Sequence, residues 1–258
     1  MALPMDKGAG QTPLAFLVDA DNASAKAISE MLAEVSKFGT PIIRRVYGDW
    51  TSTQLGSWKR VLQEHSLHPV QQFANVSGKN ATDSAMIIDA MDILHQGIVK
   101  GFVLVSSDSD YTALACRIRE EGLHVIGIGK AETPESFRRA CHIFISIENL
   151  VPLIPAPEAV TGRETPTPPQ VPIPSPPARS PPSEALGILN RAFDNVDQGD
   201  GVVHLAGLGQ ALYQLDPAFD PRTYGKPKLV DLIESFPDAF AVERRTERGP
   251  GAVYVRRK

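Results

Sequence analysis

The sequence is poor in the residues that form disulfides and soft-metal sites. Its 258 residues include only two cysteines, Cys116 and Cys141, which lie far apart and form no C-x-x-C pair. The six histidines show no metal-ligand spacing. A disulfide framework and a cysteine- or histidine-based zinc site are therefore not indicated.

Long apolar runs and a strong charge of either sign are also missing. No run approaches the roughly 18 apolar residues of a membrane span, and residues 1–14 lack the apolar core of a signal peptide. The net charge of −4 excludes a strongly basic nucleic-acid coat but permits a local basic groove. We therefore expect a soluble, cytoplasmic protein with no membrane partner.

Three common catalytic motifs are absent. The sequence has no G-x-x-x-x-G-K-[ST] loop, no G-x-G-x-x-G turn and no G-x-S-x-G elbow, so nucleoside triphosphate hydrolysis, dinucleotide binding and acyl transfer have no support. Metal-assisted displacement at phosphorus, the chemistry of nucleases and phosphatases, remains compatible with the residues present.

Proline divides the chain. Between residues 151 and 183, 12 of 33 residues are proline, out of 22 in the whole sequence. Such a composition is typical of an extended linker between domains that can move separately. We expect a flexible N-terminus at 1–13, a first domain at 14–150, the linker at 151–183 and a second domain at 184–258.

The first domain has the alternating pattern of βαβ units, which predicts an α/β fold with a mainly parallel sheet. Helices should fill the gaps between strands, and ligands of such sheets lie beyond the carboxyl ends of the strands. The expected strands are residues 15–18, 42–47, 67–73, 101–105, 124–128 and 142–147.

Acidic residues follow two of these strands. Asp19, Asp21 and Asn22 come directly after the first, and Asp108 and Asp110 after the fourth. If the two strands are neighbours, about 4.8 Å apart, these side chains converge on one small volume. Clustered carboxylates repel one another unless a cation lies among them, and such hard oxygen ligands suit Mg²⁺ or Mn²⁺.

Helix capping is the alternative explanation for these residues, because Asp, Asn and Ser are common caps. Asn22 or Ser24 would then cap the first helix, and Asp110 would be a first-turn acid that favours the helix dipole. For Asp21 and Asp110 both explanations stay open. Asp19 and Asp108 end apolar strands, where burial of a carboxylate is costly, and the functional explanation is favoured.

A further acid begins a helix. Asp83 shares a face with Met86, Ile87, Ala90 and Leu94, so it should start the stripe that faces the sheet. An acid at this place is either a first-turn charge or a metal ligand, and the ligand is favoured. Asp89 and Asp92 lie on other faces and are expected to be solvated. Lys79, just before this helix, is placed to reach a phosphate.

These motifs resemble those of the NYN domain, a PIN-like metal-dependent ribonuclease fold of the LabA/DUF88 kind. The resemblance covers about residues 14–150 and rests on Asp19-x-x-Asn22, Thr82-Asp83 and Ser107-Asp108-Ser109-Asp110-Tyr111. It implies a parallel sheet sandwiched by helices. It also implies a Mg²⁺ or Mn²⁺ site built by Asp19, Asp83, Asp108 and Asp110, with Asn22 positioning substrate or water; the family motif does not require Asp21.

Two other α/β families fit the acidic motifs less well. A haloacid-dehalogenase-like phosphatase would use Asp19 and Asp21 in a D-x-D-x-[TV] motif, but Ala23 occupies the Thr/Val position and no cap domain is evident. A receiver-like domain would use Lys130 after a late strand, but its pattern has no place for the acids at 108 and 110.

The C-terminal residues predict a small winged helix with three helices, at 185–193, 203–213 and 228–235, and a hairpin. Residues 244–258 hold six basic residues and one acid, a local charge of +5, which suits phosphate contacts. A solvated charge run that protects a hairpin edge is the alternative. The candidate RNA-binding residues here are Lys226, Lys228, Arg244, Arg245, Arg248 and Arg256.

This region resembles the OST-HTH or LOTUS domain across residues 183–258. The matching run includes Gly201-x-Val203-x-Leu205-x-x-Leu208-Gly209, Pro217-x-Phe219-Asp220-x-Arg222-x-Tyr224-Gly225 and Lys228-Leu229-x-x-Leu232-Ile233. The resemblance implies binding of RNA, single-stranded or G-rich, or docking of a protein partner. We therefore expect a metal-dependent ribonuclease with a tethered RNA-binding domain; a non-catalytic RNA adaptor is the alternative, and a metal-dependent phosphatase is a weaker one.

Overall fold

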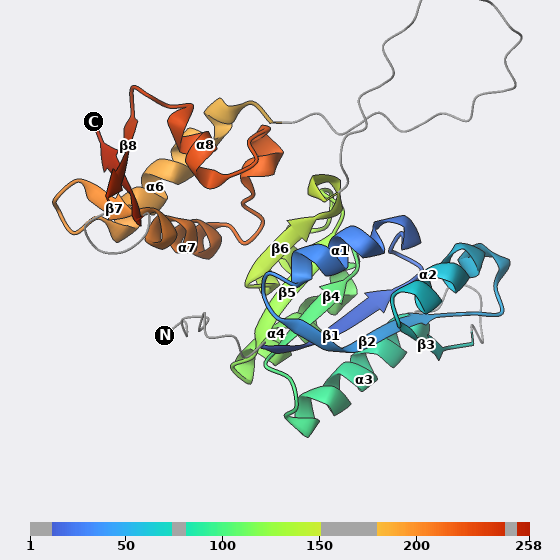
Figure 1. Ribbon diagram of the computed structural model, residues 1–258. Helices are drawn as coiled ribbons and strands as arrows, with labels where there is room; N and C mark the ends of the chain where they lie inside the picture. Colours follow the sequence, from blue (N-terminus) through green and yellow to red (C-terminus); the bar gives the residue numbers. More distant parts are fainter. Residues whose placement is uncertain (1–11, 74–80, 151–179, 246–251) are drawn as a thin grey trace, which may run out of the picture.

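The computed structural model describes residues 12–73, 81–150, 180–245 and 252–258. The N-terminal domain is built on a six-stranded sheet in which every neighbouring pair is parallel, in the order β3-β2-β1-β4-β5-β6 (Figure 1). Its strands are β1 (Pro13–Asp19), β2 (Thr40–Gly48), β3 (His68–Gln71), β4 (Gly101–Val105), β5 (His124–Gly129) and β6 (Ile143–Ser146).

Helices cover both faces of this sheet because successive side chains of a strand point to opposite sides. In β1, Phe16 and Val18 belong to one buried apolar cluster, which includes residues of α1 and α2. Ala15 and Leu17 belong to the other, which includes residues of α3, α4 and α5. These helices are α1 (Ile28–Val35), α2 (Trp58–Glu64), α3 (Ala81–Gln96), α4 (Thr112–Glu120) and α5 (Glu135–Ala140).

The α/β class and the parallel sheet are therefore confirmed. The strand expected at 67–73 is shorter, since β3 ends at Gln71. The strands that carry the two acidic motifs are neighbours, with Val18 opposite Val105. Their carboxyl ends consequently meet at one edge of the sheet, where the acids follow.

The expectation that Asp89 is solvated is wrong. The buried Tyr47 hydroxyl and the Arg45 guanidinium both donate hydrogen bonds to its carboxylate, which is 21% exposed. The cause is tertiary: α3 lies over β2, so a residue off the main apolar stripe of the helix still meets polar side chains of the strand. Asp92 is exposed, as expected.

Two histidines lie side by side at the other end of the sheet. The rings of His124 and His142 stack with their centroids 4.3 Å apart. The Nδ1 atom of His142 accepts the backbone N–H of Val125 at 3.1 Å. Burial, with a further contribution from the neighbouring His124, lowers the pKa of His142 to about 4. The neutral ring is thus the folded form of this side chain.

The C-terminal domain has its own apolar core, to which Leu189, Phe193, Leu212 and Leu232 contribute. The expected three helices and hairpin are present. Its sheet has a third strand that the sequence did not reveal, β7, in the antiparallel order β7-β9-β8. The elements are α6 (Leu186–Val196), β7 (Val202–His204), α7 (Leu205–Leu215), α8 (Leu229–Glu234), β8 (Phe240–Arg245) and β9 (Ala252–Arg257), with 3₁₀ turns η5 (Pro182–Ala185) and η6 (Pro221–Tyr224).

The C-terminal domain lies beside the β6 end of the large sheet (Figure 1). The backbone N–H of Phe144 in β6 donates to the Pro217 carbonyl at 2.8 Å. Across the parts of the chain that the structure describes, no helix has the length and apolar character needed to cross a membrane.

Candidate metal centre

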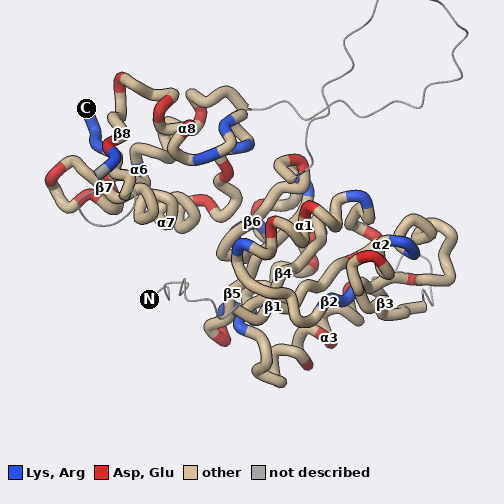
Figure 2. Tube along the Cα trace, in the orientation of Figure 1, with Lys and Arg blue, Asp and Glu red and all other residues tan. Residues whose placement is uncertain are grey.

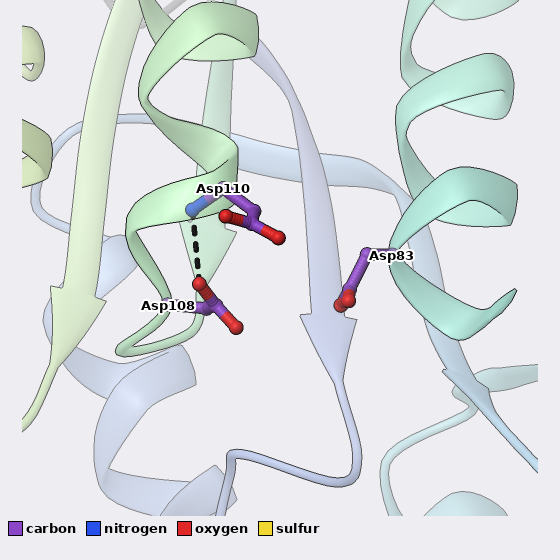
Figure 3. A group of neighbouring side chains, drawn as sticks. All are labelled: Asp83, Asp108 and Asp110. Carbon is purple, nitrogen blue, oxygen red and sulfur yellow. Dashed lines mark hydrogen bonds between the residues drawn. The ribbon is translucent and has the colours of Figure 1, made fainter. Parts of the chain in front are cut away.

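Three carboxylates from two separate segments meet at the carboxyl edge of the sheet. Asp83 comes from the first turn of α3, and Asp108 and Asp110 come from the segment between β4 and α4; they point toward the same space (Figure 3). Each offers an oxygen, and these oxygens lie within 4.8 Å of one another. Oxygens at this spacing can surround one small divalent cation after minor side-chain adjustment, because Mg²⁺ takes oxygen ligands at about 2.1 Å.

Local structure accounts for the place of Asp108. It is the N-cap of the 3₁₀ turn η3 (Ser109–Tyr111), and its Oδ1 accepts the backbone N–H of Asp110 at 2.9 Å. Capping and membership of the carboxylate cluster are therefore compatible for this residue. The cap also fixes the turn that carries Asp110, whose side chain is exposed.

Tyr111 orients Asp83. Its ring is fully buried and its hydroxyl donates to Asp83 Oδ1 at 2.7 Å. Burial raises the pKa of the Asp83 carboxyl, and the charges of Asp108, Asp110 and Asp21 raise it further, against the hydrogen bond from Tyr111. Negative charge is thus crowded here, and a cation would relieve this repulsion.

Asp19 lies beside this cluster without belonging to it. It is completely buried, and its Oδ2 accepts hydrogen bonds from Asn22 Nδ2 at 2.7 Å and Ser106 Oγ at 3.1 Å. Its Oδ1 accepts the backbone N–H of Asp21 at 3.1 Å. Burial raises the pKa of Asp19, with a smaller contribution from the Asp83 charge.

The first acidic loop is tied to α3 rather than used as a helix cap. The Asn22 side chain donates its hydrogen bond to Asp19. Ser24 is the N-cap of the following 3₁₀ turn but makes no side-chain cap hydrogen bond. Asp21 is exposed and its Oδ2 accepts a hydrogen bond from the Thr82 hydroxyl at 3.1 Å. This bond joins the end of β1 to the start of the helix that presents Asp83.

Sequence reasoning gave no individual role to Ser106 and Tyr111. Ser106 is buried, and its hydroxyl both donates to Asp19 and accepts the backbone N–H of Asp108 at 3.1 Å. It therefore links the two acidic strand ends. A hydroxyl residue directly after an apolar strand and an aromatic residue after an acidic run were the only signals in the sequence.

The candidate RNA-binding residues of the C-terminal domain are partly engaged with acids. Arg244 lies 3.6 Å from Glu234, and Arg256 lies 2.6 Å from Glu243. Lys228 is exposed and precedes α8. Figure 2 shows basic residues at the end of β9. Lys226 is partly exposed; Lys79, Arg248 and the side chain of Arg245 lie outside the described residues.

Comparison with known families decides the classification of the first domain. The NYN domain model matches residues 13–148. The chain belongs to the NYN domain family. The OST-HTH/LOTUS domain model matches residues 179–251, so the NYN domain is followed by an OST-HTH domain. The haloacid dehalogenase and receiver alternatives consequently lose their support.

No curated protein matches the chain. Among solved structures, a protein of unknown function from Vibrio parahaemolyticus is 16% identical and covers 55% of this chain and 96% of its own, with a TM-score of 0.46. An uncharacterized protein from Nitrosomonas europaea is 28% identical over 38% of this chain and 90% of its own, with a TM-score of 0.26. The MurG protein of Acinetobacter baumannii is 12% identical over 52% of this chain and 40% of its own, with a TM-score of 0.34.

The NYN domain is a PIN-like nuclease domain, a class that uses divalent metals. The observed donors fit that use: carboxylate oxygens from two elements converge, and they are hard ligands of the kind Mg²⁺ and Mn²⁺ prefer. The two domain types together indicate nuclease function and RNA binding.

Proposed function

We propose that this NYN protein is a metal-dependent ribonuclease that hydrolyses RNA phosphodiester bonds. The observation that supports it most is the convergence of Asp83, Asp108 and Asp110 at the carboxyl edge of the parallel sheet. Asp83, Asp108 and Asp110 would hold a Mg²⁺ or Mn²⁺ ion, and the fully buried Asp19 would contribute from the neighbouring strand. When bound, such an ion activates water and stabilises charge on phosphate oxygens.

The residues around the carboxylates keep them in place. Tyr111 holds one oxygen of Asp83, and Ser106 and Asn22 hold Oδ2 of Asp19. Fixed orientation matters because charge stabilisation costs least when the groups do not reorganise during the reaction. Asn22 is exposed and lies at the edge of the site, so it can also contact the substrate or its attacking water.

The OST-HTH domain would supply RNA affinity. The lysines at 226 and 228 directly precede α8, the arginines at 244 and 245 lie in β8, and the arginine at 256 lies in β9. Arg248, outside the described residues, is proposed to contact RNA as well. The exposed ion pairs of Arg244 and Arg256 contribute little stability, so phosphates can replace the carboxylates as their partners. Lys79, before α3, would contact a phosphate near the metal.

The test is cleavage of end-labelled single-stranded, duplex and G-rich RNAs in Mg²⁺, Mn²⁺ or EDTA. The wild type should cut RNA with either metal and lose activity in EDTA. Asp108→Asn should lose cleavage, because it removes one ligand charge while an asparagine can still cap η3. Asp92→Asn, on an exposed face of α3, is the matched control and should keep full activity.

Two results would overturn the proposal. A fully active Asp108→Asn protein would remove the carboxylate cluster from the chemistry. Absence of cleavage under every condition, with RNA binding retained, would favour a non-catalytic RNA adaptor instead.

A further inference from the structure

The C-terminal domain contacts the NYN domain at the edge of the large sheet. β6 is the last strand in the order β3-β2-β1-β4-β5-β6, so no strand among the described residues pairs with its outer side. The Phe144 N–H in β6 donates to the carbonyl of Pro217, from the loop between α7 and η6, at 2.8 Å. Unpaired strand edges promote aggregation, and proteins commonly cover them.

Two further contacts lie next to this backbone hydrogen bond. Ala218, next to Pro217, packs against the apolar cluster that includes Phe144 and Cys141, on the face that α3, α4 and α5 cover. Beyond the end of β6, Asn149 Nδ2 donates to the Thr223 hydroxyl at 3.0 Å. The loop and η6 therefore follow the edge of the sheet rather than touch it at one point.

An ion pair completes the contact on the opposite face. The guanidinium of Arg222 donates to both carboxylate oxygens of Glu34 in α1, each at 3.2 Å. The two side chains are 29% and 13% exposed. Bidentate Arg–carboxylate pairs fix the relative orientation of their partners, and partial burial reduces screening by salt.

Neighbouring charged groups hold both members of this ion pair. Arg222 also donates to both oxygens of Asp220, at 2.7 to 3.0 Å, and this neighbour in its own domain helps to orient the guanidinium toward Glu34. Burial would raise the pKa of Glu34, but hydrogen bonds from Lys37 and Arg222 outweigh it and lower this pKa. The ion pair therefore stays charged at neutral pH.

From these contacts we infer that the NYN domain carries a docking surface for this chain's own OST-HTH domain, formed by the β6 edge at Phe144, Glu34 of α1 and Asn149. The occupant is the segment from Pro217 to Thr223. The proline-rich linker expected at 151–183 makes the contact intramolecular, and short flexible tethers give effective concentrations of about 1 mM, which fall as the tether lengthens. A modest interface is enough to stay closed under that condition. This docking does not depend on the chain being a nuclease.

The Phe144 amide gives a direct test, because its hydrogen-bond partner belongs to the other domain. Amide hydrogen exchange of the full-length protein, resolved by residue in NMR spectra, should show this amide protected. Two variants, one in each domain, should open the interface. Ala218→Arg introduces a long charged side chain where a methyl group packs, and Glu34→Arg places like charges opposite Arg222. Each should accelerate exchange at Phe144 at least about tenfold.

Matched controls carry the same side-chain changes away from the contact. Ala206→Arg lies at an exposed position of α7, and Glu121→Arg removes an ion pair within the NYN domain. Both should leave exchange at Phe144 unchanged. Amides of the central strand β4 should exchange slowly in all five proteins, which shows that the NYN domain stays folded.

Three outcomes would overturn the inference. One is a wild-type Phe144 amide that exchanges as fast as in Ala218→Arg and Glu34→Arg. Another is full protection in both of these variants. The third is protection that rises with protein concentration between about 10 and 300 μM, because the occupant of the surface would then be the OST-HTH domain of a second copy.

Discussion

Asp108→Asn should have opposite effects on stability with and without metal, which separates a metal site from a purely structural cluster. In the metal-free protein, Asp83, Asp108 and Asp110 have oxygens within 4.8 Å of one another. Two unit charges at this distance repel by about 0.9 kcal/mol at the dielectric constant of water and about 3.5 kcal/mol at an effective value of 20. Since Asp110 is exposed, the lower figure applies, and neutralising Asp108 should stabilise the metal-free NYN domain by about 1 kcal/mol.

With metal bound, the wild type should be more stable than Asp108→Asn. A ligand at a hundred times its Kd stabilises the folded state by about 2.7 kcal/mol. For a domain of this size, each kcal/mol corresponds to about 4 °C in Tm. Saturating Mn²⁺ should therefore raise the Tm of the wild type by about 10 °C. Asp108→Asn should melt about 4 °C above the wild type in EDTA and respond little to Mn²⁺.

The assay is thermal unfolding followed by circular dichroism in EDTA and across a Mn²⁺ titration, with Asp92→Asn as control. Asp92→Asn should follow the wild type under both conditions. If Asp108→Asn is less stable than the wild type in EDTA, the repulsion argument is wrong. An equal response of both proteins to Mn²⁺ would show that the metal binds elsewhere.

Three further predictions concern other parts of the molecule. The lowered pKa of His142 stabilises the fold above pH 6.5, and this contribution is lost as the pH falls toward 4. His142→Asn keeps an acceptor for the Val125 N–H, so it should reduce this decline in the free energy of unfolding by about 1–2 kcal/mol in urea titrations. Asp89→Asn should cost about 2 kcal/mol in urea unfolding, because Arg45 loses its charged partner; a change below 0.5 kcal/mol would contradict this. Replacing Lys226 and Lys228 together by alanine should weaken RNA binding about tenfold and reduce the salt slope by about 1.4, measured by fluorescence anisotropy; an unchanged slope would remove these lysines from the interface.

The fold class followed from local pattern. The apolar runs before Asp19 and Asp108 have the length and composition of buried strands, and the residues around Met86 and Ala90 have helical spacing. Such periodicity directly records which side of an element faces the core. The strand β7 was missed because it has three residues and is paired with β9, some 50 residues further along the chain.

The candidate site was only partly visible in the sequence. The acids at 19, 83, 108 and 110 stand out because each lies at the end of a strand or the start of a helix. Distances between them are not encoded locally, and in the structure the buried Asp19, whose two oxygens both accept hydrogen bonds, lies beside the cluster of the other three. The roles of Ser106 and Tyr111 depend on hydrogen bonds to residues far away in the chain, which local patterns do not reveal.

The sequence by itself determined the alternation of strands and helices, the division at the proline-rich segment and the acidic strand ends, because these depend on local composition and periodicity. Only the tertiary structure decided that β1 and β4 are neighbours, that Asp89 is paired rather than solvated, and that Arg222 meets Glu34. Each of these contacts joins segments that are distant in the chain. Their partners are selected by the packing of whole elements, and no local pattern contains that information.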